Sequence, residues 1–266
     1  MKRLLADSPR GILVIVHGAF EHSGRYDETA AFYQQQGFHV IYGDLPGQGK
    51  SSRRRGHIQR FDEYIDAICE WVEKAQSFEL PVFLLGHSMG GLAVIRTMEL
   101  RKLNVQAVLL SSPALGIYEK PTKPVEIVSR VLDMVYPKMK VETPAFSEKI
   151  TRNIDVMERD RDDTLILDKI SVRWYWEFVR GMKRAFKQID DYPDVPTLIM
   201  QAGEDLMVNI DKTKDWFHKL DISEKSYKEW PSMYHEILNE PERLTVYQYM
   251  NSYLQFQLDK AMFVRR

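Results

Sequence analysis

The chain of 266 residues contains one cysteine, Cys69, and carries a net charge of only −1. A lone cysteine cannot form an internal disulfide, which is typical of proteins from a reducing compartment. The near-neutral charge gives no reason to expect nucleic acid as a partner. No apolar run approaches the roughly 20 residues of a membrane span, and the N-terminus turns polar too early for a signal peptide. We therefore expect a cytoplasmic protein that, at most, contacts a membrane peripherally.

The sequence does contain short apolar runs that alternate with helical patterns. Runs without polar alternation are typical of strands covered on both faces, as in a parallel sheet, and the order of elements predicts an α/β fold. The predicted strands span residues 11–16, 38–42, 82–85, 107–110, 197–200 and 225–230. The predicted helices span residues 27–36, 61–75, 92–100, 123–134, 172–186 and 241–258. Cys69 falls in the apolar stripe of one helix, so we interpret it as a core residue and not as a nucleophile.

The stretch from Leu80 to Gly91 joins a predicted strand to a predicted helix through a turn that contains a serine. Gly86 and Gly90 stand two residues before and after Ser88, where a side chain would collide in so tight a turn. This is the G-x-S-x-G nucleophile elbow, which holds a serine hydroxyl above the edge of a sheet. The alternative is an ordinary glycine-rich turn, but the strand-turn-helix context favours the elbow.

A serine hydroxyl is nearly inert at neutral pH and needs a general base beside it. In chains with this elbow, an acid and then a histidine follow the serine, each in a loop at the carboxyl end of a strand. Asp205 follows strand 197–200 and His235 follows strand 225–230. Glu204 is the alternative acid, less favoured because its side chain is longer and it lies closer to the strand. The sequence thus predicts a triad of Ser88, Asp205 and His235.

Acyl transfer also needs two backbone N–H groups that bind the developing oxyanion. The residue after the nucleophile, Met89, is expected to supply one, and Ala19, in the loop after strand 11–16, the other. Of the remaining histidines, we expect His17 and His87 to have structural roles, and we keep His57 as a minor candidate for the wall of the cleft.

The loop from Asp44 to Ser51 ends in Gly49-Lys50-Ser51, which looks like part of a phosphate-binding P-loop. That motif requires a glycine where this chain has Asp44, so a carboxylate would lie where backbone N–H groups should surround the phosphate. We favour a tight loop in which Asp44 accepts hydrogen bonds from the backbone. The basic run Arg53–Arg55 is interpreted as a solvated patch, with contact to anionic lipid headgroups as the alternative.

More than 80 residues separate strands 107–110 and 197–200, with helical periodicity and no strand pattern. This is too long for a plain crossover, so we predict a helical cap over residues 114–190, inserted between core segments 1–113 and 191–266. Two groups of apolar residues either pack the cap on the core, form a wall for an acyl chain, or rest on a bilayer. They are Val125, Ile127, Val128, Val131, Leu132, Met134, Val135 and Tyr136, and then Trp174, Tyr175, Trp176, Phe178 and Val179.

Three motifs of the chain occur together in the members of one protein family. They are His17-Gly18-Ala19 with Glu21-His22 and Arg25-Tyr26, Asp44-Leu45-Pro46-Gly47-Gln48-Gly49-Lys50-Ser51, and Gly86-His87-Ser88-Met89-Gly90-Gly91. On these motifs, and over nearly its whole length, the chain resembles the monoacylglycerol lipase and lysophospholipase branch of the α/β-hydrolases, and it is close to the Bacillus-type phospholipases of this group.

The resemblance implies an α/β-hydrolase fold, with a mostly parallel sheet, helices on both faces and an inserted helical cap. It implies cleavage of carboxylic esters of glycerolipids without metal or organic cofactor. The family's triad carries onto Ser88, Asp205 and His235, and its oxyanion donors onto Ala19 and Met89. The chain departs from the family pattern at Phe20, where glycine is frequent and the site becomes narrower, and at Gln48, where histidine is common.

We therefore interpret the chain as a serine hydrolase of monoacylglycerol or lysophospholipid, with possible contact of the cap with a membrane. The alternatives are a thioesterase, a peptidase-like or small-ester hydrolase with the same triad, and a non-catalytic ligand-binding protein. Headgroup, acyl-chain preference and oligomeric state stay open at this point.

Overall fold

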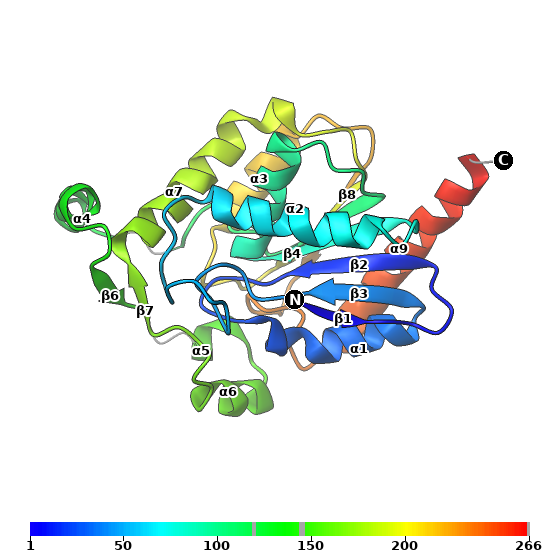
Figure 1. Ribbon diagram of the computed structural model, residues 1–266, viewed down its shortest axis with the longest axis horizontal. Coiled ribbons are helices and arrows are strands. Elements are labelled where there is room, and N and C mark those ends of the chain that lie inside the picture. The colour runs from blue at the N-terminus through cyan, green and yellow to red at the C-terminus, as the bar shows by residue number, and fades with distance from the viewer. Residues whose placement is uncertain (119–120, 144–146, 265–266) are drawn as a thin grey trace.

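A computed structural model describes residues 1–118, 121–143 and 147–264. Its centre is a seven-stranded sheet in the order β1-β3-β2-β4-β5-β8-β9 (Figure 1). Every neighbouring pair is parallel except β1 and β3. The strands are β1 Lys2–Leu4, β2 Gly11–Val16, β3 Phe38–Tyr42, β4 Val82–His87, β5 Ala107–Ser111, β8 Thr197–Ala202 and β9 Lys225–Trp230. The predicted mostly parallel α/β sheet is confirmed; the short antiparallel edge strand β1 was not predicted.

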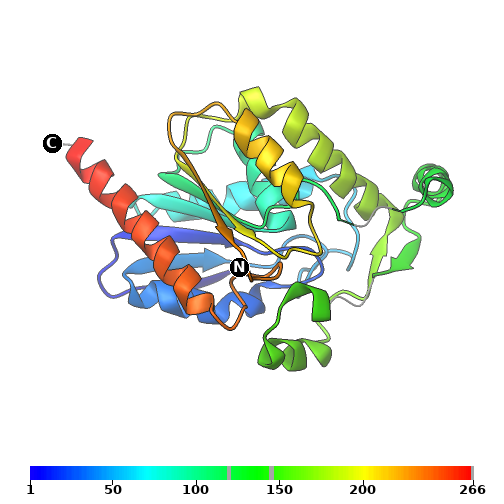
Figure 2. The same ribbon diagram turned by 180° about the vertical axis from the view of Figure 1, so that it is seen from behind.

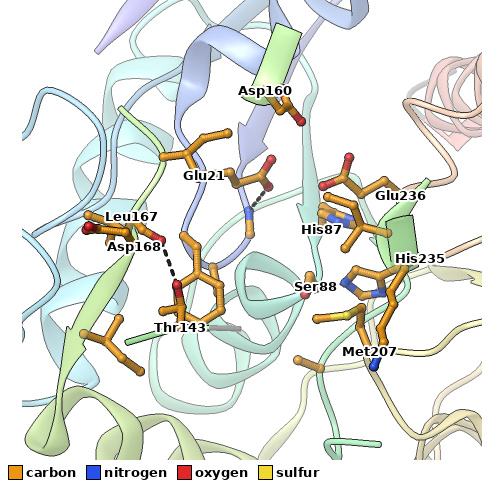
Figure 3. Close-up of a pocket in the computed structure, with 18 of the residues that line it drawn as sticks. Glu21, His87, Ser88, Thr143, Asp160, Leu167, Asp168, Met207, His235 and Glu236 are labelled. Atoms are coloured by element: carbon orange, nitrogen blue, oxygen red, sulfur yellow. Dashed lines mark hydrogen bonds between the residues drawn. The ribbon is translucent and has the colours of Figure 1, made fainter. Parts of the chain in front are cut away.

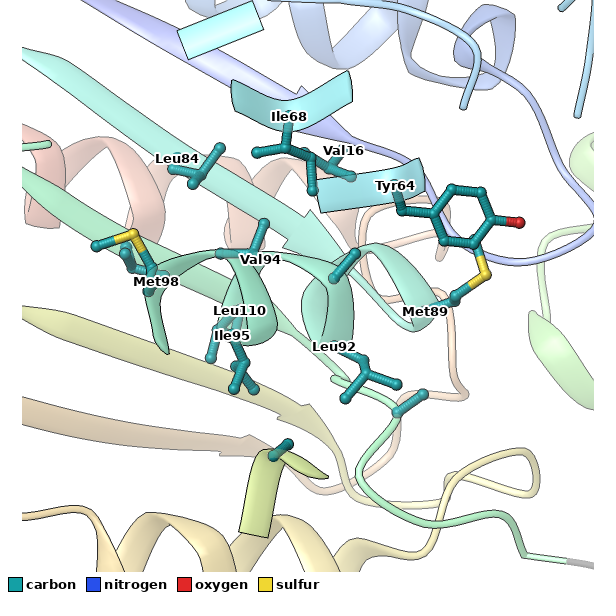
Figure 4. Packing of buried hydrophobic residues seen from close by; sticks show 14 of the residues in the cluster. Val16, Tyr64, Ile68, Leu84, Met89, Leu92, Val94, Ile95, Met98 and Leu110 are labelled. Carbon is teal, nitrogen blue, oxygen red and sulfur yellow. The ribbon is translucent and has the colours of Figure 1, made fainter. Parts of the chain in front are cut away.

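Alternate residues of the buried strands point to opposite faces, and a separate core lies on each face. Ile12 and Val14 of β2 join the core under α2 (Asp62–Gln76), α3 (Met89–Leu100), α7 (Val172–Lys187) and α8 (Ile210–Lys219). Leu13 and Ile15 join the core under α1 (Asp27–Gln35) and α9 (Arg243–Val264), which lies across the sheet from α2 (Figures 1 and 2). Figure 4 shows α3 packed between β4, β5 and α2. This packing fixes the start of α3, where the elbow lies.

The chain between β5 and β8 contains helices and, against expectation, two short strands. Residues 119–120 and 144–146 of the predicted cap lie outside the described residues. Strand β6 (Lys140–Glu142) pairs antiparallel with β7 (Lys169–Ser171). The other elements are α4 Lys123–Val135, α5 Ser147–Ile150, α6 Ile154–Arg161, α7 and the 3-10 helix η2 Ile189–Asp191. The expectation of no strand here was wrong, because three residues per strand are too few to show alternation. We call residues 114–190 the cap segment; its boundaries stay a prediction.

No helix within the described ranges is long and apolar enough to cross a membrane.

Candidate active site

Ser88 lies at the turn between β4 and α3 with φ of +51° and ψ of −119°. This backbone conformation is strained for a residue with a side chain, as the elbow requires. Glycines on either side permit the turn. A Cβ on Gly90 would lie 2.3 Å from the carbonyl oxygen of Val16, and one on Gly86 would lie 2.6 Å from that of Gly90. The predicted strand-turn-helix context of Ser88 is therefore present.

The structure brings Ser88, His235 and Asp205 together, although 147 residues separate Ser88 from His235. His235 Nε2 lies 2.8 Å from Ser88 Oγ, and His235 Nδ1 lies 2.8 Å from Asp205 Oδ2 (Figure 3 shows Ser88 and His235). Asp205 Oδ1 accepts hydrogen bonds from the backbone N–H groups of Met207 and Val208, both at 2.9 Å. Glu204 is exposed, so the structure places Asp205, and not its neighbour, beside the histidine.

Asp205 and His235 each shift the pKa of the other toward its charged form. Burial alone would raise the pKa of Asp205, but the His235 imidazolium and the hydrogen bonds from His235 and the backbone lower it below its usual value. Burial alone would lower the pKa of His235, but the Asp205 carboxylate, with smaller contributions from Glu236 and Glu21, outweighs burial and raises that pKa. The neighbouring His87 is also buried, and burial followed by the charge of His235 lowers its pKa to about 4. His87 is therefore neutral near pH 7, so it adds no second positive charge beside His235.

The predicted oxyanion donors lie on two sides of Ser88. Met89 is the first residue of α3, and Ala19 lies in the loop after β2. A Cβ on Gly18 would lie 3.2 Å from Ser88 Cβ, so the loop that carries Ala19 approaches the nucleophile closely. In the described part of the chain, the N–H groups of Ala19 and Met89 donate to no acceptor. The geometry thus leaves both donors available to a substrate oxygen; their catalytic role remains our proposal.

Ser88 and His235 open on a cavity of about 770 Å³ between the core and the cap segment. Its wall includes Phe20, Trp174 and Phe178, whose rings form a row with neighbouring centroids 5.2 Å apart. Two of these come from the aromatic group that the sequence singled out on the cap. Trp176 of the same group lies instead under Arg130, whose guanidinium carbon is 4.5 Å from the ring centroid.

The remaining candidates have structural contacts. Asp44 accepts hydrogen bonds from the N–H groups of Ser23 at 2.8 Å and Lys50 at 2.7 Å, as the non-nucleotide interpretation of this loop predicted. His17 Nε2 accepts from the N–H of Leu45. His57 Nδ1 contacts the hydroxyl of Ser171 at 2.7 Å and does not line the cavity.

At one end of the cavity lies a charged cluster whose role the sequence did not reveal. It consists of Glu21, Arg25, Asp160 and Glu236, and we call it the Arg25 cluster; Figure 3 labels its three carboxylates. Burial alone would raise the pKa of Glu21, but Arg25 and the nearby histidines lower it to about 2. The first family motif includes Glu21 and Arg25, but nothing in it points to Asp160 or Glu236.

Among the residues that the structure describes, no group of His, Cys, Asp or Glu side chains is placed to hold a metal ion. The expectation of catalysis without a cofactor stays a prediction.

Comparison with known proteins agrees with this geometry. The family model of serine aminopeptidases, S33, matches residues 7–242. The chain is 44% identical to phospholipase YtpA of Bacillus subtilis over 243 residues, covering 91% of this chain and 94% of that protein. It is 30% identical to monoglyceride lipase of Homo sapiens, covering 86% of this chain and 82% of that protein.

Among solved structures, the monoacylglycerol lipase of Paleococcus ferrophilus superposes with a TM-score of 0.86 at 30% identity, covering 96% of this chain and 98% of that one. Comparison of structures and comparison of sequences thus lead to the same group of relatives. The chain belongs to the serine aminopeptidase S33 family and, within the α/β-hydrolases, to the monoacylglycerol lipase branch.

Proposed function

We propose that this protein is a serine hydrolase of carboxylic esters of glycerolipids, either monoacylglycerols or lysophospholipids. One observation carries the proposal. A continuous chain of 2.8 Å contacts runs from Asp205 through His235 to Ser88, and Ser88 faces a largely apolar cavity. Relatives named as a phospholipase and as monoglyceride lipases support this substrate class.

In the proposed mechanism Ser88 Oγ attacks the acyl carbonyl while His235 Nε2 takes its proton. Asp205 holds Nδ1–H of His235 and stabilises the imidazolium that forms. The N–H groups of Ala19 and Met89 bind the oxyanion of the tetrahedral intermediate. His235 then protonates the glycerol leaving oxygen, and water releases the fatty acid from Ser88 by the same steps in reverse.

The test is a comparison of wild type with Ser88→Ala. We expect turnover of a short p-nitrophenyl ester to fall by roughly 10³-fold or more, because the nucleophile is lost while the fold remains. A fluorophosphonate should label wild type and not the variant. Unchanged turnover in the variant would remove Ser88 from the mechanism, and a folded wild type that neither hydrolyses esters nor is labelled would favour a binding protein.

A substrate panel then separates the remaining alternatives. Monoacylglycerol, lysophosphatidylcholine, an acyl-CoA and an aminoacyl amide represent the two lipid classes, a thioesterase and a peptidase. The aminoacyl amide belongs in the panel because the family model is described by an aminopeptidase. We expect the two glycerolipids to give the highest kcat/KM; a preference for the amide or the thioester would move the assignment to that class.

We also propose that the cap segment contacts a membrane from the side, through α4. This helix stands out from the body of the molecule (Figure 1). Its charged side faces α7, where Asp133 accepts hydrogen bonds from Arg173 and Arg180. Its apolar side is exposed: Val125, Ile127, Val128, Val131, Met134, Val135 and Tyr136 are all at least half accessible. An exposed apolar face of this size favours an interfacial role.

The membrane proposal is tested with Ile127→Asp and the matched control Ile154→Asp. The two isoleucines are 64% and 65% exposed, but Ile154 lies on α6, away from the α4 face. We expect only Ile127→Asp to lower the bound fraction on phosphatidylethanolamine–phosphatidylglycerol vesicles, by roughly tenfold, because a charge enters the interface. Equal losses in both variants, or no loss in either, would contradict the assignment to α4.

A further inference from the structure

Arg25, in the 3-10 helix η1 (Ser23–Tyr26), is only 4% exposed, and its guanidinium binds three carboxylates from separate parts of the chain. Its Nη1 and Nη2 atoms donate to the two carboxylate oxygens of Glu236, each at 2.7 Å. Nη1 also donates to Glu21, and Nη2 to Asp160. A planar guanidinium with five fixed donors is suited to such multiple contacts, and a lysine ammonium is not.

The contact with Glu21 leads to the oxyanion loop. The second oxygen of Glu21 accepts hydrogen bonds from the backbone N–H of Gly18 and, at 2.8 Å, from the hydroxyl of Tyr26. A Cβ on Gly18 would lie 2.8 Å from this oxygen, so a larger residue at position 18 would force the carboxylate to shift from its place beside the backbone N–H. The N–H of Gly18 belongs to the His17–Gly18 peptide, which directly precedes the Gly18–Ala19 peptide that carries the proposed oxyanion donor. Glu21 thus holds the loop one peptide before that donor.

The contact with Glu236 leads to the proposed general base. Glu236 follows His235 directly, and both its carboxylate oxygens are held by Arg25. Arg25 therefore lies between the loop of the oxyanion donor and the loop of the base, and it is tied to each by a charge-assisted hydrogen bond.

The third contact leads to the cap segment. Asp160 lies in α6, and backbone bonds join the same part of the cap to both loops. The N–H of Leu167 donates to the carbonyl of Phe20 at 2.8 Å, and the N–H of Glu236 donates to the carbonyl of Ile150 at 2.8 Å. The two catalytic loops and the cap thus meet around one side chain.

We propose that Arg25 is a positioning residue that holds the Ala19 loop and the His235 loop in register, with Asp160 as its anchor on the cap. The proposal rests on the proposed hydrolase function. It predicts that side chains that never react control kcat, because a misplacement of about 1 Å at the donor or base slows acyl transfer by up to roughly 100-fold.

The experiment compares Arg25→Lys, Glu21→Gln and the double variant in the full-length chain. We measure kcat and KM for p-nitrophenyl butyrate and the rate of Ser88 labelling by a fluorophosphonate. We expect each single variant to lower kcat and the labelling rate by roughly 10- to 100-fold, with KM changed by less than about threefold. The double variant should lose little more than the worse single one, because the two residues act as a unit.

A second pair of variants tests the anchor on the cap. Asp160→Asn should lower kcat by at least about threefold, whereas Arg152→Gln should leave kcat unchanged. Arg152 is a matched control because it also joins the cap segment to two carboxylates, Glu240 and Glu242. Both lie at the end of the loop next to α9, and in the described part of the chain the Arg152 side chain bonds neither Arg25 nor Glu236. Both variants keep Arg25 in place, so they remain informative if Arg25→Lys does not fold.

Three results would overturn the inference: wild-type kcat in folded Arg25→Lys or Glu21→Gln, additive losses in the double variant, or equal losses in Asp160→Asn and Arg152→Gln. Each presupposes an active wild type. If the wild type hydrolyses no ester and is not labelled, the proposed function itself fails, and the two failures are therefore distinguishable.

Discussion

Replacing Asp205 by asparagine is a sharp test of the site, because the surrounding hydrogen bonds decide which way the new amide faces. Asp205 Oδ1 accepts from two backbone N–H groups, those of Met207 and Val208. The amide oxygen must take this place, since an NH2 group there would face two donors. The amide nitrogen then occupies the place of Oδ2, which lies 2.8 Å from His235 Nδ1.

A donor in that place reverses the tautomer of His235. Nδ1 must accept, the ring proton moves to Nε2, and the resulting N–H points at Ser88 Oγ, whose proton the ring can no longer take. The fold should tolerate the change, because Gln201 can adapt. Its Nε2 donates to Asp205 Oδ2 at 3.0 Å, and its buried Oε1 has no partner in the described part of the chain. Turning this amide would offer Oε1 to the new NH2 group in exchange for the 3.3 Å hydrogen bond from Nε2 to the carbonyl of Ala202.

We therefore expect Asp205→Asn to lower kcat by about 10⁴-fold, or roughly 5.5 kcal/mol of transition-state stabilisation, with little change in KM or thermal midpoint. The assay is steady-state hydrolysis of p-nitrophenyl butyrate, with circular dichroism to confirm folding. Glu204→Gln, at the exposed neighbour, is the control and should be near wild type. The reasoning is refuted if Asp205→Asn keeps more than about a tenth of kcat, or if Glu204→Gln loses as much.

Two further predictions concern the same site. Because the Asp205 carboxylate raises the pKa of His235, and the base must be neutral, kcat/KM should fall as pH drops through a midpoint above the ordinary value of about 6.5. A measured midpoint at or below about 6.5 would show that burial outweighs the neighbouring carboxylates in setting the pKa of His235. Phe20 has φ of +68° and packs on Trp174, so Phe20→Gly relieves strain but removes a ring contact. Stability should change by no more than about 1 kcal/mol, and kcat/KM for bulky acyl esters should rise relative to short ones. Urea unfolding and an acyl-length series measure both; a loss of about 3 kcal/mol or an unchanged acyl preference would contradict the account.

The core of the fold could be predicted because a parallel sheet leaves a clear pattern in the sequence. Strands β2, β4 and β5 are buried on both faces and are almost wholly apolar, so each predicted strand lies within two residues of the observed one. Parallel strands place their carboxyl ends at one edge. That rule, together with the elbow motif and the order serine, acid, histidine along the chain, predicts that Ser88, Asp205 and His235 meet.

The Arg25 cluster could not be predicted in the same way. Its four side chains come from separate segments, and each belongs to a residue type that usually lies in solvent. Only the tertiary fold shows that Asp160 of α6 and Glu236 after β9 meet the guanidinium of Arg25 in a buried place. The strands β6 and β7 were not predicted for a different reason, since each has only three residues, which is too few to show alternation.

Helices α4 and α7 show most clearly what periodicity leaves open. Both have a strongly apolar face, yet α7 buries its face, including Trp174 and Phe178, while α4 exposes its valines. The difference lies in one polar contact. Asp133 of α4 is buried and binds Arg173 and Arg180 of α7, so rotating α4 to bury its apolar side would separate Asp133 from both arginines. Arg180 would keep its ion pair with Glu177, but Asp133 and Arg173 would lose their charged partners. A helix fixed with its charge inward has an apolar face that only a partner outside the fold can cover, which is the physical ground for testing Ile127→Asp on a bilayer.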